Sequence, residues 1–128
     1  MYQGIYTIKE NKKIAKDVFK MIVEGDTSAL TATGQFVNLK IDGLYLRRPI
    51  SVCDYDDSTI TLIYKVVGAG TEIMSTRVAG EKFDILVGLG NGYNTDKSGE
   101  APLLIGGGVG VPPMYGLCKK LVSEGKKP

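Results

Sequence analysis

The sequence contains no histidine, and this absence limits the chemistry that its own side chains can perform. Histidine is the side chain that proteins use most often as a general base and as a ligand for transition metals. The sequence also shows no obvious pair of a nucleophilic side chain and a neighbouring base. We therefore expect no catalytic residue, and we expect any chemistry to be supplied by a bound cofactor.

Cysteine is also scarce, because the chain has only Cys53 and Cys118. The two lie far apart and form no C-x-x-C pair, so the sequence lacks the usual patterns of a metal or iron–sulfur site. Free cysteines usually behave as small buried hydrophobic residues, and we expect that role for both. No metal-binding residue is predicted.

Long apolar runs and a strong net charge are missing as well. No run approaches the ~20 apolar residues that a membrane span requires, and the N-terminal stretch MYQGIYTIKENKK lacks the apolar segment of a secretory signal. The 16 Lys and Arg nearly balance the 14 Asp and Glu, and they form no basic stripe. We expect a cytoplasmic protein that binds neither membrane nor nucleic acid.

What is present is an ordinary globular composition, with 43% apolar and 23% charged residues in 128 positions. That length suffices for one compact domain plus a fragment. Six segments show strand-like alternation or β-branched composition. They are YQGIYTIKE and IAKDVFKMIVE with NKK between them, QFVNLKI, GLYLRRPISVCDYDD, STITLIYKVV and KFDILVG. A short helix is predicted from Thr71, as its N-cap, to about Val78.

Six short strands and one small helix predict a mainly β fold, a six-stranded antiparallel Greek-key barrel over residues 1–94. Residues 95–102 are predicted to form a linker, because NGYNTDKSGEAP is rich in Gly, Asn and Ser. Residues 103–128 are predicted to form a lone β-α unit. Its strand and its helix face need another apolar surface, and self-association is the expected source. The residues concerned are Leu103 to Ile105, Val111, Met114, Leu117 and Leu121.

The segment RRPIS, Arg47 to Ser51, stands at the start of a predicted strand. An arginine there can pair with a phosphate through its planar guanidinium group, and a serine three residues later can hydrogen-bond a planar heterocycle. Alternatively, the arginine of this motif is only a solvated charge that precedes a residue at the edge of a sheet.

The segment VVGAGTE, Val66 to Glu72, places Gly70 and Thr71 at a helix N-terminus, which favours an anion such as a pyrophosphate. A plain glycine-rich turn is equally compatible with it.

A third motif, GGGVGVPP, follows the apolar residues LLI and leads into a helix that Pro112 and Pro113 can begin. A glycine turn in this position can approach a dinucleotide pyrophosphate, which makes Gly107, Gly108 and Gly110 candidate contacts. The acidic residue that would bind a ribose is missing. The motif therefore predicts an incomplete NAD site.

Together these motifs resemble the electron transfer subunits of dihydroorotate dehydrogenase, within the ferredoxin reductase-like flavoproteins. The stretches that carry the resemblance are RRPISVCDYD, LIYKVVGAGTE, LVGLGNGY and LLIGGGVGVPPMYGL. In that family a barrel binds FAD, a following α/β domain binds NAD, and a cysteine cluster holds a two-iron two-sulfur centre. The resemblance implies electron transfer between NAD and a catalytic dihydroorotate dehydrogenase subunit, in pyrimidine biosynthesis.

The resemblance also assigns roles to residues of the FAD site. Contacts to the flavin and its pyrophosphate would come from Arg48, Pro49, Ile50 and Ser51. The adenine-ribose side would be lined by Ile63, Tyr64 and Lys65, and Gly70 with Thr71 would cap the pyrophosphate. Ile50 stands where wider ferredoxin reductases carry an aromatic residue, and Val87-Gly88 replaces a common Gly-Pro. Most of the NAD domain and the cysteine cluster are missing, and truncation is the expected reason.

Three functions remain open from the sequence. The first is an FAD-binding electron-transfer subunit, which we expect to be inactive alone as a 128-residue chain. The second is a small barrel that binds a ligand or partner without catalysis, since one fold hosts many functions. The third is a flavin or ferredoxin reductase-like component of another redox complex. Flavin absorbance separates the first from the second.

Overall fold

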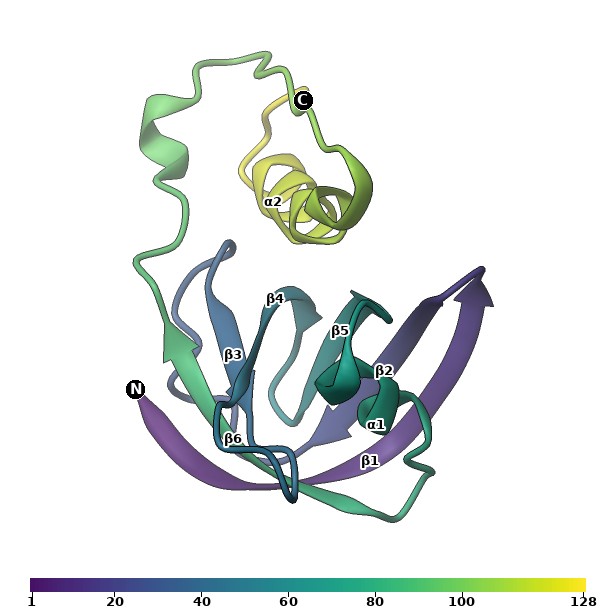
Figure 1. The fold of residues 1–128 in the computed structure, drawn as a ribbon. Helices are drawn as coiled ribbons and strands as arrows, with labels where there is room; N and C mark the ends of the chain where they lie inside the picture. The colour runs from purple at the N-terminus through teal and green to yellow at the C-terminus, as the bar shows by residue number, and fades with distance from the viewer.

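The computed structural model describes residues 1–128 and contains a closed barrel of six strands (Figure 1). The strands are β1 (Tyr2–Ala15), β2 (Val18–Glu24), β3 (Phe36–Leu39), β4 (Arg48–Tyr55), β5 (Thr59–Lys65) and β6 (Lys82–Leu89). They follow one another around the barrel in the order β1-β2-β5-β4-β3-β6, and every neighbouring pair is antiparallel. The pairings β2–β5 and β3–β6 skip strands, as Greek-key connections do. The predicted six-stranded antiparallel barrel is confirmed.

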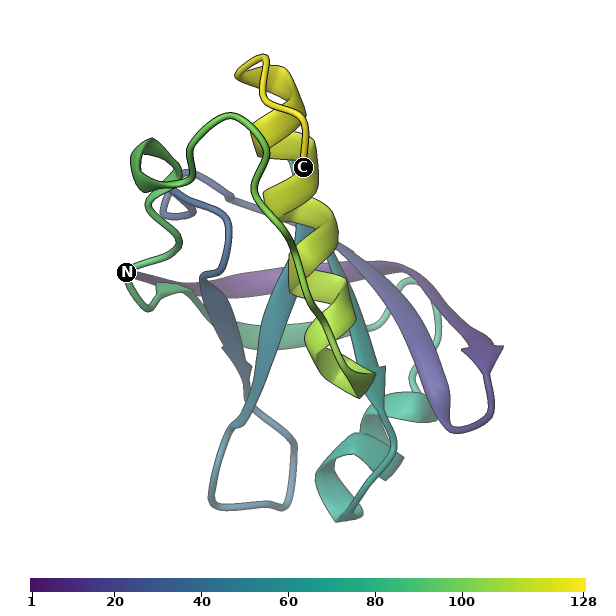
Figure 2. The same ribbon diagram turned by 90° about the horizontal axis from the view of Figure 1, so that it is seen from above.

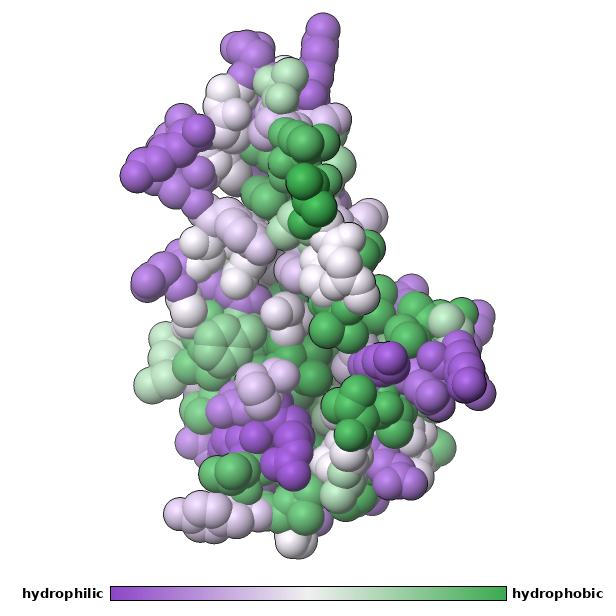
Figure 3. Space-filling view, turned by 45° about the horizontal axis from the view of Figure 1, so that its top comes forward, coloured by the Kyte–Doolittle hydropathy of each residue, from purple (hydrophilic) through white to green (hydrophobic).

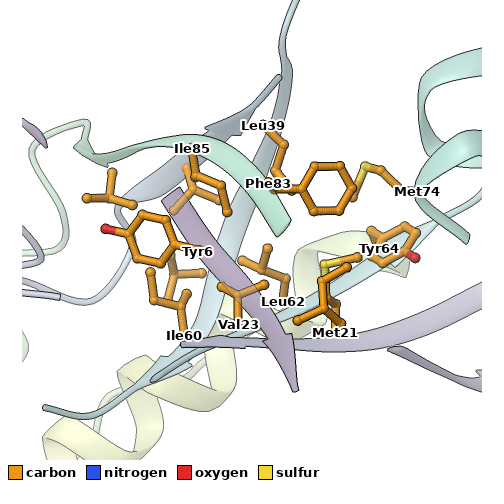
Figure 4. Packing of buried hydrophobic residues seen from close by; sticks show 14 of the residues in the cluster. Tyr6, Met21, Val23, Leu39, Ile60, Leu62, Tyr64, Met74, Phe83 and Ile85 are labelled. Carbon is orange, nitrogen blue, oxygen red and sulfur yellow. The ribbon is translucent and has the colours of Figure 1, made fainter. Parts of the chain in front are cut away.

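The hydrophobic core fills the barrel because alternate residues of each strand point inward. Along β5 the inward residues Ile60, Leu62 and Tyr64 are buried, whereas Ile63 is only partly so. Figure 4 shows the ring of Tyr64 inside this core, near Met21. Its hydroxyl donates to Asn11 Oδ1 at 2.8 Å, and burial raises its pKa to about 12. Tyr64 is therefore a structural core residue.

The first hairpin turns later than the sequence indicates. We predicted a break at NKK, but these residues lie inside β1, where Asn11, Lys12 and Lys13 pair with residues of β2. The turn lies at Lys16 and Asp17, and Asp17 has a φ of 56° in the left-handed region. The prediction was wrong because Lys12 and Lys13 are exposed and do not interrupt the strand, while the partly buried Asn11 bonds Tyr64.

The helix after β5 also begins earlier than predicted. It is α1 (Ala69–Ser75), with Gly68 as its N-cap residue and Thr71 as its third residue. The Thr71 hydroxyl oxygen accepts hydrogen bonds from the backbone N–H groups of Val67 at 2.9 Å and Gly68 at 3.2 Å. Thr71 therefore organises the turn between β5 and α1 from inside the helix, and its assignment as N-cap was wrong.

Residues 103–128 form a helix but no strand. Leu103 to Ile105 do not form a strand, because no other strand pairs with them. The helix α2 (Val111–Ser123) lies across the barrel at β4, as Figures 1 and 2 show. A Cβ at Gly116 would stand 2.6 Å from the Cys53 carbonyl oxygen, so glycine permits this close approach. Lys119 Nζ pairs with Asp54 of β4 at 2.9 Å.

The apolar face predicted for this helix is largely covered within the chain itself. Leu117 and Leu121 are buried, and Met114 is partly buried. Val111 remains half exposed, and Leu103 and Ile105 are about four-fifths exposed. The barrel thus supplies much of the apolar surface against which the helix face was expected to pack. No helix of the structure has both the length and the apolar character to cross a bilayer.

Candidate functional site

A cleft of about 400 Å³ lies on the outside of the barrel, over the start of β4 and the end of β5. These two segments meet because β4 and β5 are antiparallel neighbours, with Val52 opposite Leu62. Every predicted site residue on the two strands lines the cleft, and Thr71 of α1 closes one side. The full lining is Arg48, Pro49, Ile50, Ser51, Ile63, Tyr64, Lys65, Val67, Thr71 and Val109.

Arg48 is the cationic side chain best placed for an anionic ligand. One of its terminal nitrogens donates to the Leu46 carbonyl oxygen, and its side chain rests against α1 at Gly70. A Cβ at Gly70 would stand 2.2 Å from Arg48 Nε, so a larger residue at position 70 would require the Arg48 side chain to shift. The guanidinium group keeps further N–H donors for a ligand. Gly70 itself is buried, and the Arg48 side chain packs against it.

The neighbouring Arg47 has a different role. Its guanidinium group pairs with the Asp84 carboxylate of β6 at 3.1 Å and also donates to the Asn38 and Asp84 carbonyl oxygens. These contacts hold the start of β4 against β3 and β6. Of the two adjacent arginines, one is engaged in the barrel and the other faces the cleft. The pair therefore provides a matched comparison for experiments.

On β5 the strand periodicity separates Ile63 and Lys65 from Tyr64. Ile63 is partly exposed and Lys65 is exposed, so both offer side chains to the outer surface. The Tyr64 ring points into the core instead, where it stacks on Phe19 with the ring centroids 5.8 Å apart. The resemblance placed Tyr64 on an adenine-ribose side, but its ring is not available to a ligand there.

The glycine motif lies next to the same cleft. Gly108–Gly110 form a 3₁₀ turn whose Val109 lines the cleft. A Cβ at Gly107, Gly108 or Gly110 would meet no other atom within 4 Å, and Gly108 has a left-handed φ of 54°. The backbone of the turn is thus open to close approach from outside. Gly107, Gly108 and Gly110 themselves do not line the 400 Å³ cleft.

A second cleft of about 540 Å³ adjoins the first, and sequence reasoning missed it. The two share Ile63, and the glycine turn borders both. The second cleft lies between β5, β4 and the N-terminal half of α2. Its lining is Ile14, Lys20, Cys53, Asp54, Thr61, Ile63, Gly108, Val111, Pro112 and Tyr115. It forms because α2 folds back onto β4, a long-range contact that no local pattern indicates.

The two cysteines lie near this region without forming a disulfide. Cys53 is buried and Cys118 is partly buried, and both are free thiols. Burial raises the pKa of the Cys53 thiol, which favours its uncharged form at neutral pH. The structure contains no cluster of three or more potential metal ligands. Figure 3 shows that hydrophobic and hydrophilic residues are intermixed on the face that it presents.

Curated proteins with similar sequences share one name. The dihydroorotate dehydrogenase B (NAD(+)) electron transfer subunit of Enterococcus faecalis is 42% identical over 98% of this chain and 50% of its own length. The subunit of that name from Geobacillus is 41% identical over 98% of the chain, and that from Bacillus mycoides is 40% identical over 92%. The curated relatives of this chain are dihydroorotate dehydrogenase electron transfer subunits. The chain spans about half the length of these relatives, and no family model matches it.

Solved structures with a similar fold include several reductases. An NADH-dependent reduced ferredoxin-NADP oxidoreductase matches 95% of the chain and 45% of its own, with a TM-score of 0.85 and 30% identity. A ferredoxin NADP+ reductase from Neisseria gonorrhoeae with bound FAD and NADP matches 98% of the chain and 54% of its own, with a TM-score of 0.79 and 15% identity. The barrel has the fold of ferredoxin reductase-like FAD-binding domains.

Proposed function

We propose that this chain is the FAD-binding part of an electron transfer subunit of the dihydroorotate dehydrogenase type. The observation that carries the proposal is the cleft over β4 and β5. It brings together Arg48–Ser51, Ile63–Lys65 and Thr71, which come from separate segments of the sequence. The names of the sequence relatives, which are electron transfer subunits, support the same function.

The residues that line the cleft are compatible with FAD in charge and polarity. Arg48 would hold the pyrophosphate, and Lys65 adds a second positive charge to the same cleft. Ile50 would cover the flavin with an aliphatic side chain, and the exposed Ser51 would hydrogen-bond its polar edge. The room that Gly70 leaves for the Arg48 side chain is consistent with a position reserved for binding an anion. When bound, FAD would supply the redox chemistry, and these residues would bind and orient it.

Titration of the purified chain with FAD tests the proposal. Saturable quenching of flavin fluorescence at one FAD per chain is expected, together with the absorbance bands of oxidised flavin in protein purified with the cofactor. A colourless protein that takes up no added FAD would favour the second reading, a barrel that binds another ligand or partner without catalysis.

We further propose the catalytic dihydroorotate dehydrogenase subunit as the partner, in the cytoplasm. The relatives are named as electron transfer subunits, which implies a protein that exchanges electrons with them. The 30% identity to a ferredoxin-NADP oxidoreductase favours a component of another redox complex as the second candidate. Co-elution of the FAD-loaded chain with the catalytic subunit, but not with a ferredoxin, is the result expected from the first.

Self-association of the chain is a further expected outcome. Leu103 and Ile105 are 83% and 79% exposed, and Val111 is 53% exposed, so apolar surface remains uncovered near α2. Burying these side chains in a second copy would remove them from water. Sedimentation velocity at tens of micromolar is expected to show a dimer or larger species. A clean monomer at that concentration would contradict this expectation.

The FAD-loaded chain is expected to oxidise NADH negligibly. A hydride donor must be held about 3–3.5 Å from the flavin, which takes groups that position both halves of the dinucleotide. The glycine turn at Gly107–Gly110 offers contacts for a pyrophosphate only. Anaerobic stopped-flow mixing with NADH is the measurement. Rapid bleaching of the flavin that saturates with NADH concentration would show that the chain forms a working NAD site.

A further inference from the structure

The loop between β3 and β4 presents an aromatic ring to solvent on a firmly held base. Ile41 is buried and Leu44 packs against the core, while the Leu44 N–H donates to the Ile41 carbonyl oxygen at 3.1 Å. Gly43, with a φ of +83°, allows the chain to reverse there. Tyr45 follows and is 99% exposed. A large aromatic side chain is thus held fully in water by a loop whose base is fixed.

Arg48 places this loop at the phosphate end of the cleft. Its guanidinium group donates to the Leu46 carbonyl oxygen, one residue from Tyr45, while its side chain rests against Gly70 of α1. Figure 2 shows that the β3–β4 loop and α1 project from the same side of the barrel, beyond the ends of β4 and β5. Tyr45 therefore lies just outside the point where a pyrophosphate would bind.

A dinucleotide held at Arg48 has to extend in two directions. One half lies along the cleft over β4 and β5, and the other half passes beyond Arg48, the first residue of β4. Tyr64 cannot receive an adenine there, because its ring lies in the core. Tyr45 supplies an exposed aromatic face at that end, and every base can stack on such a face.

We propose that Tyr45 stacks on the adenine of FAD and thereby makes the cleft prefer FAD to FMN, which lacks the adenosine half. This inference rests on the proposed FAD site and adds a specificity-determining residue to it. Val67 lines the cleft and is 77% exposed, and Leu46, whose carbonyl oxygen accepts from Arg48, is 66% exposed. Both would cover the edges of the base. Tyr45 contacts the adenine directly in this proposal and takes no part in electron transfer.

Dissociation constants of FAD and FMN for the Tyr45→Ala and Tyr45→Phe variants test the inference. Tyr45→Ala is expected to weaken FAD binding about 5- to 150-fold, the range of one base–aromatic stack, and to leave FMN binding unchanged. Tyr45→Phe keeps the ring and should bind FAD like the wild type. Tyr2→Ala is the matched control, because Tyr2 is an exposed tyrosine on β1, which pairs with neither β4 nor β5.

ADP supplies a second readout that does not depend on the flavin. It should compete with FAD for the wild type and for Tyr45→Phe, and compete much more weakly for Tyr45→Ala. Equal FAD affinity in the wild type and Tyr45→Ala would overturn the inference while the FAD site stands. An equal loss for FAD and FMN would also overturn it, since that pattern indicates a structural role. A wild type that binds no FAD would overturn the proposed function together with the inference.

Discussion

Replacing Arg48 with alanine is expected to weaken FAD binding by about 1.5–3 kcal/mol, which is roughly a 10- to 150-fold increase in Kd. The loss corresponds to charge-assisted hydrogen bonds between the guanidinium group and the pyrophosphate. Stability should change little, because Arg48 lies at the outer end of β4 and its side chain makes one hydrogen bond within the protein. Isothermal titration with FAD measures the effect.

Arg47→Ala is the matched control for this prediction. Arg47 is the adjacent residue and carries the same charge, but it pairs with Asp84 of β6. The variant should bind FAD with the affinity of the wild type and unfold at a lower temperature, since it loses the ion pair with Asp84 and two hydrogen bonds to carbonyl oxygens. Equal FAD affinity in Arg48→Ala and the wild type would remove Arg48 from the site. An equal loss in both variants would indicate a general effect of charge instead.

Leu62→Ala is expected to lower the free energy of unfolding by about 2–5 kcal/mol. Leu62 is completely buried in the middle of β5, and its removal leaves a cavity that the closed barrel cannot collapse to fill. Urea unfolding followed by circular dichroism measures the change. The FAD affinity of the fraction that remains folded should be retained, because this side chain points away from the cleft.

Ile63→Ala, one residue further along β5, provides the comparison. Ile63 is partly exposed and lines both clefts, so the variant should lose less stability than Leu62→Ala and more FAD affinity. The opposite order, with Ile63→Ala the less stable of the two, would mean that the inward and outward faces of β5 have been exchanged. Such an exchange follows from a shift of one residue in the strand register.

The barrel could be predicted from the sequence because its strands alternate cleanly, as Ile60, Leu62 and Tyr64 do along β5. Local patterns failed where the outcome depends on distant partners. Leu103 to Ile105 have strand-like composition but no neighbouring strand to pair with. The NKK segment has turn-like charges but continues β1, because its two lysines are exposed and its asparagine bonds the distant Tyr64.

The same distinction applies to the candidate site. The motif RRPIS and the motif at Ile63–Lys65 could be assigned to one site by resemblance, and the β4–β5 pairing brings them into one cleft. The resemblance assigns Arg48 to the site, but local sequence alone does not show which of the two arginines faces the cleft, because that depends on Asp84 reaching Arg47 from β6. The second cleft depends on α2 packing against β4, and the exposure of Tyr45 depends on how its loop is anchored.

Backbone amide NMR spectra recorded during an FAD titration test most directly whether FAD binds in the β4–β5 cleft. With FAD bound there, the largest shift changes should fall on Arg48, Ile50 and Ser51, on Ile63–Lys65 and on Gly70–Thr71. Amides of β1 and β6 on the far side of the barrel should move little. Shift changes confined to residues of the second cleft such as Thr61 and Tyr115, or no saturable change anywhere, would contradict the proposed site.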